Sequence, residues 1–153
     1  MQKMFAVIRM AGNVGMTRKI RDKLKILGLH AVNNCVVLPD TPSYRGMITR
    51  IRDYVAYGTI DMETLAAMLE KRGRTEDNKR LSEKTLKVMG CKTTEELAKV
   101  LVEGKTTMKA AGLKRIFRLT PPSHGFKSTR KQWPRGDLGD RKEAINELIE
   151  RMI

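Results

Sequence analysis

The residues best suited to chemistry lie in one stretch, SHGFKSTRKQWPRGDLGDRK, residues 123–142. This stretch combines many Lys and Arg residues with several Gly residues and two aromatic residues, Phe126 and Trp133, the latter the only tryptophan of the chain. The guanidinium of Arg is a planar fork of donors that suits phosphate, and an aromatic ring can stack on an unpaired base. The stretch therefore favours contact with structured RNA, with packing of Trp133 in the core as the alternative.

A second candidate is the loop GNVG, residues 12–15, between an apolar run and a basic helix. Free backbone N–H groups at a helix N-terminus attract anions such as phosphate. A Walker A loop is not supported, because Met16 and Thr17 follow where a Lys is required. A GxxG clamp on an RNA backbone needs flanking helices, whereas a strand precedes this loop. We expect a turn that also touches phosphate, with a plain flexible turn as the alternative, because basic residues surround it: Arg9, Arg18 and Arg21.

No other residues have catalytic or metal-binding spacing. His30 and His124 have no evident partners, and Cys35 and Cys91 lie far apart in the sequence. A structural zinc site needs about four clustered ligands, which this pattern does not offer. We therefore expect no enzymatic activity, no metal and no cofactor. We also expect two reduced, buried cysteines, with one disulfide between them as the alternative.

The charge is the most informative feature of the composition. The chain carries a net charge of +14 and has a pI of about 10.1, which implies a polyanionic partner. An anionic membrane is the alternative, but it would favour one basic amphipathic helix, and the basic residues here are spread over helices and loops. The N-terminal apolar run is short and contains Arg9, so it is neither a signal peptide nor a membrane span. We expect a soluble, cytoplasmic protein that binds nucleic acid.

The first part of the chain predicts the order β-α-β-α-β. The apolar runs 4–10 and 34–38 are typical of buried strands, and a third strand is expected around residues 54–60, where helix and strand compete. Thr17 and Thr41 are the expected caps of two helices that cover one face of the sheet. Periodicity leaves the strand pairing open between a parallel crossover and an antiparallel, ferredoxin-like arrangement.

The second part, residues 61–153, is expected to be an extension packed on an RNA-binding core formed by residues 1–60. A basic loop, residues 123–139, leads to a C-terminal helix that a capping box of Asp140 and Glu143 opens. The other expected elements of this part are a helix after Asp61, a helix over 82–89, a helix after the capping box of Thr93 and Glu96, and a strand over 113–119.

Two segments, RMAGNVGMTRKIRDKLKILGL (9–29) and LPDTPSYRGMITRIRDYVAYG (38–58), resemble the ribosomal protein L-thirty family of the large subunit. The pattern TPxxRGMIxxxxxYV is the most specific part of this resemblance. The segments FRLTPPSHGFKSTRKQW (117–133) and RGDLGDRKEAINELIERMI (135–153) are similar to the longer archaeal and eukaryotic members, whereas the short bacterial members end before them. The resemblance covers nearly the whole chain and indicates the archaeal type.

The resemblance implies an α+β fold with a three-stranded antiparallel sheet and two helices on one face. It also implies a structural constituent of the large ribosomal subunit that binds ribosomal RNA beside neighbouring ribosomal proteins, without catalysis or a small-molecule substrate. A free RNA-binding or RNA-chaperone protein and an RNA-modifying enzyme are the alternatives. The expected RNA contacts are Arg9, Asn13, Thr17, Arg18, Arg21, Lys25, Ser43, Tyr44, Arg45, Arg52, Phe126, Lys127, Arg130, Lys131, Trp133 and Arg135.

Overall fold

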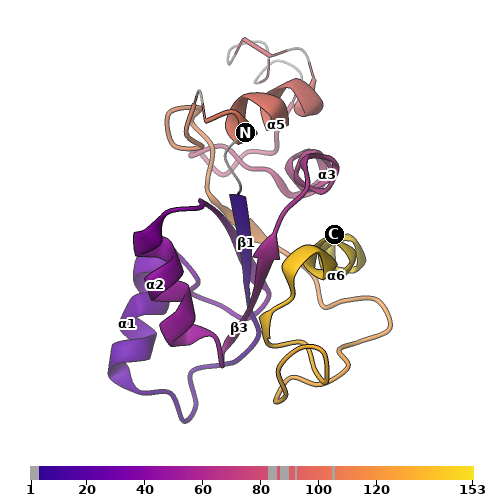
Figure 1. Ribbon diagram of the computed structural model, residues 1–153. Coiled ribbons are helices and arrows are strands. Elements are labelled where there is room, and N and C mark those ends of the chain that lie inside the picture. Colours follow the sequence, from indigo (N-terminus) through magenta and orange to yellow (C-terminus); the bar gives the residue numbers. More distant parts are fainter. Residues whose placement is uncertain (1–3, 83–85, 87–89, 92, 105) are drawn as a thin grey trace.

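The computed structural model describes residues 4–82, 86, 90–91, 93–104 and 106–153 of the chain. One sheet forms the middle of the molecule, with helices on both of its faces (Figure 1). The first part has the predicted order, and its elements are β1 (Met4–Arg9), α1 (Arg18–Leu27), β2 (Asn34–Pro39), α2 (Pro42–Ile51) and β3 (Val55–Thr59).

The sheet has the strand order β4-β2-β1-β3-β5. The central strand β1 pairs antiparallel with both β2 and β3, so that Val7 lies opposite Val36 on one side and Tyr57 on the other. This pairing confirms the antiparallel arrangement of the first three strands. The prediction of three strands in the sheet was too low, because β4 (Ile116–Arg118) and β5 (Gly139–Asp140) add to its edges. They pair with backbone groups that a three-stranded sheet would leave free at both edges.

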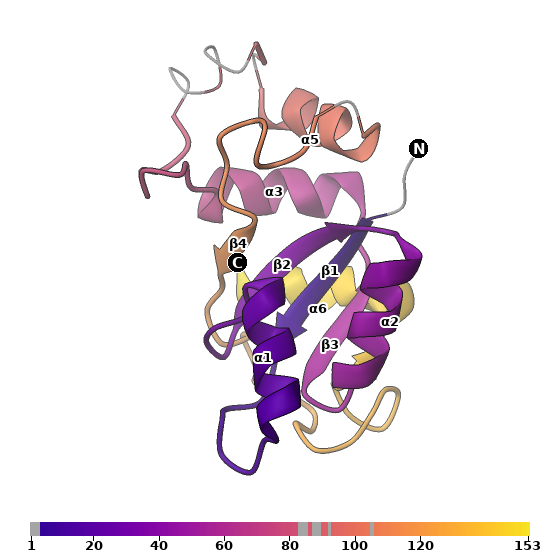
Figure 2. The ribbon, with the colours of Figure 1, turned by 90° about the vertical axis from the view of Figure 1, so that its left-hand side faces the viewer.

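Helices α1 and α2 lie together on one face of the sheet, as predicted (Figure 2). Their buried residues Leu24, Leu27, Ile48 and Ile51 pack against a cluster that includes Val7 and other alternate strand residues. Side chains of a strand point alternately to its two faces, so the neighbours of Val7 enter a different cluster. The apolar run that predicted β1 is thus buried on both faces.

Local hydrogen bonds explain where these two helices begin. Thr41 Oγ1 accepts a hydrogen bond from the backbone N–H of Tyr44 at 3.4 Å, and Pro42 occupies the first turn of α2, where a missing N–H costs least. Thr17 occupies the cap position of α1, but its side chain makes no capping hydrogen bond. The predicted cap is therefore confirmed in full for α2 and in position only for α1.

The opposite face of the sheet is covered by α6 (Ile145–Met152), which follows a short 3₁₀ helix, η1 (Lys142–Ala144). The apolar stripe of α6 packs against the side chains of the strands that point away from α1 and α2. Gly58 of β3 permits this contact, because a Cβ atom there would collide with the carbonyl oxygen of Lys142 and press against Ile145. The C-terminal helix thus completes a three-layer arrangement (Figure 2).

The predicted capping box of Asp140 and Glu143 at the start of the C-terminal helix was wrong. Asp140 belongs to β5 and pairs with Tyr57, and the cap position of α6 is Ala144, without a side-chain hydrogen bond. Asp140 Oδ1 instead accepts from the backbone N–H of Lys142 at 2.9 Å. Because this segment pairs with the edge of the sheet, α6 begins later in the chain than predicted. A local sequence pattern contains no sign of this pairing.

Helices α3 (Met62–Arg72) and α5 (Thr94–Val102) pack on each other at one end of the sheet (Figure 2). Thr93 Oγ1 accepts from the N–H of Glu96 at 3.3 Å, as the predicted cap requires.

The helix predicted over 82–89 falls mostly outside the described residues. Among the described residues, no helix is long and apolar enough to cross a membrane. Both cysteines are free and buried, as expected, and burial raises the pKa of Cys35 to about 12.

An Ile51→Ala variant is expected to lower the free energy of unfolding by about 2–5 kcal/mol, because Ile51 is 0% exposed and the change leaves a cavity in the core. Chemical denaturation followed by circular dichroism measures this loss. The matched control is Arg45→Ala with Arg52→Ala, on the same helix and at its end, where exposed side chains contribute little to stability. A control that unfolds while Ile51→Ala stays stable would mean that the two helix faces are reversed.

Candidate nucleic-acid interface

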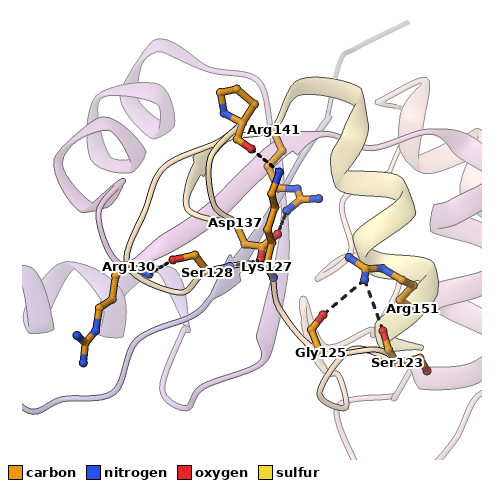
Figure 3. Close-up of polar contacts among 9 residues, drawn as sticks. Ser123, Gly125, Lys127, Ser128, Arg130, Asp137, Arg141 and Arg151 are labelled. Atoms are coloured by element: carbon orange, nitrogen blue, oxygen red, sulfur yellow. Dashed lines mark hydrogen bonds and ion pairs between the residues drawn. The ribbon is translucent and has the colours of Figure 1, made fainter.

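The segment 123–142 folds around a buried ion pair. The carboxylate of Asp137 binds the guanidinium of Arg141, and both side chains are 2% exposed. The other carboxylate oxygen of Asp137 accepts from the backbone N–H groups of Lys127 at 2.5 Å and Ser128 at 3.2 Å (Figure 3). A buried charge requires such compensation from partners. Asp137 therefore connects the two ends of the basic loop.

The rest of the segment is closed by backbone contacts. The N–H of Trp133 donates to the carbonyl of Leu138 at 2.8 Å, and that of Gly136 donates to Gln132 at 2.9 Å. A Cβ atom at Gly136 would collide with the carbonyl of Lys131, so only glycine fits here without a shift. Gly136 therefore serves the close approach of the loop's own backbone.

The C-terminal helix holds the beginning of the same segment. Arg151 of α6 donates to the backbone carbonyls of Ser123 and Gly125, both at 3.5 Å (Figure 3). Phe126 is partly buried and packs against the larger hydrophobic cluster. The side chain of Phe126 is thus used for packing on the protein itself, and not for the stacking on RNA that the sequence suggested.

The basic side chains of this loop are exposed. Lys127, Arg130, Lys131 and Arg135 all face solvent, and no ion pair found in the described part of the chain involves any of them. The Nζ of Lys127 donates to the carbonyl of Pro134 at 3.2 Å, while Arg130 extends away from the Asp137 centre (Figure 3). Four uncompensated charges on one loop attract phosphate.

Trp133 lies among these charges, outside both hydrophobic clusters of the described residues. Its side chain is 38% exposed. The guanidinium carbon of Arg141 lies over the ring, 4.4 Å from its centroid, as in a cation–π interaction. Core packing, the alternative considered for Trp133, does not describe this position.

Arg9 has a different place from the one the sequence suggested. Its side chain is 3% exposed, and burial, followed by the charge of Arg21, lowers its pKa. Its donors are occupied inside the protein by Ala11 O at 2.8 Å, Leu29 O at 2.9 Å, His30 O at 2.9 Å and Asn13 Oδ1 at 2.6 Å. Arg9 therefore holds the 11–16 loop through Ala11 and Asn13, and its donors are not free for RNA.

The 11–16 loop and the start of α1 remain accessible. Val14 at the tip is fully exposed, and nothing lies close to Gly12 or Gly15. Arg21 is half-buried and donates to the carbonyl of Met16 at 3.4 Å. The exposed predicted contacts of this region are Asn13, Thr17, Arg18 and Lys25.

Helix packing adds cationic residues that sequence reasoning missed. Burial, followed by the charges of Arg50 and Lys19, lowers the pKa of Lys23. Lys19 and Lys23 are four residues apart on α1, a spacing that places them on one helix face. That spacing was visible in the sequence, but the approach of Arg50 depends on how α2 packs against α1.

The start of α2 presents fewer free charges than predicted. Arg45 makes a two-pronged ion pair with Asp40, which is the main cause of its raised pKa, and its guanidinium lies 5.7 Å from the ring centroid of Phe5. Tyr44 is half-buried against the smaller cluster, whereas Ser43 and Arg52 are exposed. Arg52 lies 3.8 Å from a carboxylate oxygen of Asp53.

The described residues contain no group of three or more His, Cys, Asp or Glu side chains that could hold a metal ion. The described residues form an α+β domain with exposed cations on a loop and on two adjacent helices. Such a surface is typical of a protein that binds a phosphate backbone. Comparison with known proteins defines this class further. The profile of the family described as Ribosomal protein L30p/L7e matches residues 5–55.

Relatives cover almost the entire chain. The large ribosomal subunit protein uL30 of Archaeoglobus fulgidus is 50% identical over 151 residues, which are 97% of this chain and 99% of the relative. The protein of the same name from Nanoarchaeum equitans is 44% identical over 153 residues, 98% of this chain and 99% of the relative. The chain therefore belongs to the ribosomal protein L30p/L7e family, as the sequence resemblance indicated.

Proposed function

We propose that the protein is a structural constituent of the large ribosomal subunit, in the cytoplasm, where it binds and stabilises folded ribosomal RNA. The observation that carries this proposal is the basic loop, which exposes four cations around the buried pair of Asp137 and Arg141. Cations carried by a folded loop can neutralise phosphates and release their counterions. The names of the relatives, which place them in the large subunit, support the same role.

The proposed phosphate and sugar contacts differ from the original set in a few positions. Arg9 and Phe126 are omitted because they are used inside the protein, Tyr44 because it packs on the smaller cluster, and Arg45 because it pairs with Asp40. Trp133 stays a proposed contact to a base and is treated separately below, and the cations gathered by helix packing are added. Such contacts position a protein on RNA without reading its sequence. The proposed set is Asn13, Thr17, Arg18, Lys19, Arg21, Lys23, Lys25, Ser43, Arg50, Arg52, Lys127, Arg130, Lys131 and Arg135.

We propose that the protein acts structurally, by holding RNA helices in place. Neutralised phosphates allow RNA helices to approach each other, and the fixed loop defines their separation. Neighbouring ribosomal proteins are the other proposed partners, and the role involves no catalysis. We also propose that residues 1–60 form the RNA-binding core and that residues 61–153 form its extension, which the attachment of α6 to β3 supports.

Sedimentation of ribosomal subunits tests this proposal. A tagged copy of the protein is expressed in archaeal cells, and large subunits are pelleted through a high-salt cushion. A constituent of the subunit stays in the pellet, while a free RNA-binding protein or chaperone is washed off. An RNA-modifying enzyme would show turnover on RNA. Loss of the protein at high salt from otherwise intact subunits would contradict the proposed role.

A further inference from the structure

The position of Trp133 leaves part of its ring accessible. Arg141 covers one face and is itself only 2% exposed, so the buried side of the ring is the side of the guanidinium. Because Trp133 is nevertheless 38% exposed, the residue keeps accessible surface beyond the face that Arg141 covers. This accessible aromatic surface is outside both hydrophobic clusters of the described residues.

The ring is also held in place before any ligand arrives. Arg141 is fixed by its ion pair with Asp137, and its backbone N–H donates to the carbonyl of Tyr57 in β3 at 2.8 Å. The backbone of Trp133 is bonded to Leu138, next to β5. The ring is thus supported from the sheet edge, and a fixed surface loses less conformational entropy on binding than a mobile side chain would.

The surroundings of the ring define the chemistry of a ligand. An open hollow of about 480 Å³ adjoins the ring and is lined by Lys131, Gln132, Trp133, Pro134 and Arg135. None of these five residues is acidic, and two of them are exposed cations on either side of the ring in sequence. A flat, apolar group joined to phosphates would satisfy both the ring and the cations, and an unpaired nucleotide has this composition.

The hollow offers little with which to distinguish one base from another. The side-chain amide of Gln132 donates one of its two N–H groups to a carboxylate oxygen of Asp53 at 2.6 Å, so the protein already orients this amide. Apart from the rest of this amide, the contacts are an aromatic ring, a proline and two cations, which suit the π-face and the phosphates of any nucleotide. Stacking of this kind tolerates every base.

We infer that Trp133 is a stacking platform for one unpaired base of ribosomal RNA, with Lys131 and Arg135 on the adjoining phosphates. This inference rests on the proposed function and deepens it, since it assigns one residue to a base and separates it from the residues that contact phosphate. A protein side chain docked on the same ring is a different partner, and the test below distinguishes it.

The test uses the intact protein and a transcript of archaeal large-subunit ribosomal RNA. Binding is measured by filter retention at several salt concentrations, for the wild type, Trp133→Leu, Trp133→Phe and Arg135→Gln. Emission from the wild-type protein reports on Trp133 alone, because the chain has no other tryptophan. Thermal melts of all variants accompany the binding measurements.

A stacking platform predicts a specific combination of results. RNA quenches the emission of Trp133, and Trp133→Leu weakens binding by roughly 5- to 140-fold, the range for removal of one stacked base. The salt slope of Trp133→Leu stays unchanged, since stacking releases no counterions, whereas Arg135→Gln lowers the slope by about 0.7–0.9. Trp133→Phe keeps a ring and loses less affinity than Trp133→Leu.

Other results overturn the inference. If the wild type binds the transcript with unchanged emission and Trp133→Leu binds equally well, Trp133 is no platform, while the proposed function stands. If emission changes only when ribosomal proteins are added, the ring contacts protein. If the wild type does not bind at all, the proposed function fails together with the inference. If Trp133→Leu melts below the assay temperature, the change in wild-type emission and the affinity of Trp133→Phe decide whether the inference holds.

Discussion

An Asp137→Asn variant is expected to lose about 3–5 kcal/mol of free energy of unfolding. The side chain of Arg141 is 2% exposed and has Asp137 as its ion-pair partner, so the variant leaves a positive charge buried without a counter-charge. Asparagine has nearly the same size as aspartate and keeps an oxygen that can accept from Lys127 N or Ser128 N. The loss of stability therefore reports on the charge more than on the shape of the loop.

Urea denaturation followed by circular dichroism measures this change. The matched control is the double variant Asp137→Asn with Arg141→Met. It removes the unpaired positive charge and keeps an unbranched side chain at position 141. Replacing both members of a buried ion pair with uncharged groups is often close to neutral. The double variant is therefore expected to be more stable than the single one. A single variant as stable as the wild type would show that the pair contributes nothing to the fold.

Local sequence patterns were sufficient for the elements of the first part. The apolar run of β1 and the Thr41–Pro42 cap of α2 act over a few residues, and both have the predicted places. The pairing of the strands was left open by periodicity, because parallel and antiparallel neighbours bury the same alternating side chains. The two residues of β5 could not be predicted, since Gly139 and Asp140 have no strand pattern and are ordered by the edge of β3.

The candidate site divides in a similar way. The exposed cations of the basic loop were predictable, because a segment with few apolar residues cannot bury its Lys and Arg side chains. Arg9 and Arg141 differ from these cations, because they are only 3% and 2% exposed. Arg9 is buried because carbonyl groups distant in sequence surround its guanidinium, and Arg141 because Asp137 meets it beneath the loop. Both environments are tertiary, and a single sequence gives no sign of them.

A variant in which the four exposed cations of the basic loop are replaced by glutamine should bind ribosomal RNA with a much weaker salt dependence. Each phosphate contact contributes about 0.7–0.9 to the slope of log K against log salt concentration, so the magnitude should fall by up to roughly 3. The substituted residues are exposed, and each change should alter the free energy of unfolding by no more than about 0.5 kcal/mol. The residues replaced are Lys127, Arg130, Lys131 and Arg135.

The control must remove the same charge from another part of the surface. Two Lys and two Arg residues outside the proposed contact set are exposed and serve this purpose: Lys71, Arg80, Lys109 and Arg118. Both variants then carry the same net charge, so any difference between their salt slopes arises from position. We expect the control to keep a slope close to that of the wild type, because its cations do not lie against phosphates. Equal slopes for the two variants would mean that RNA binding follows total charge and that the basic loop has no special role.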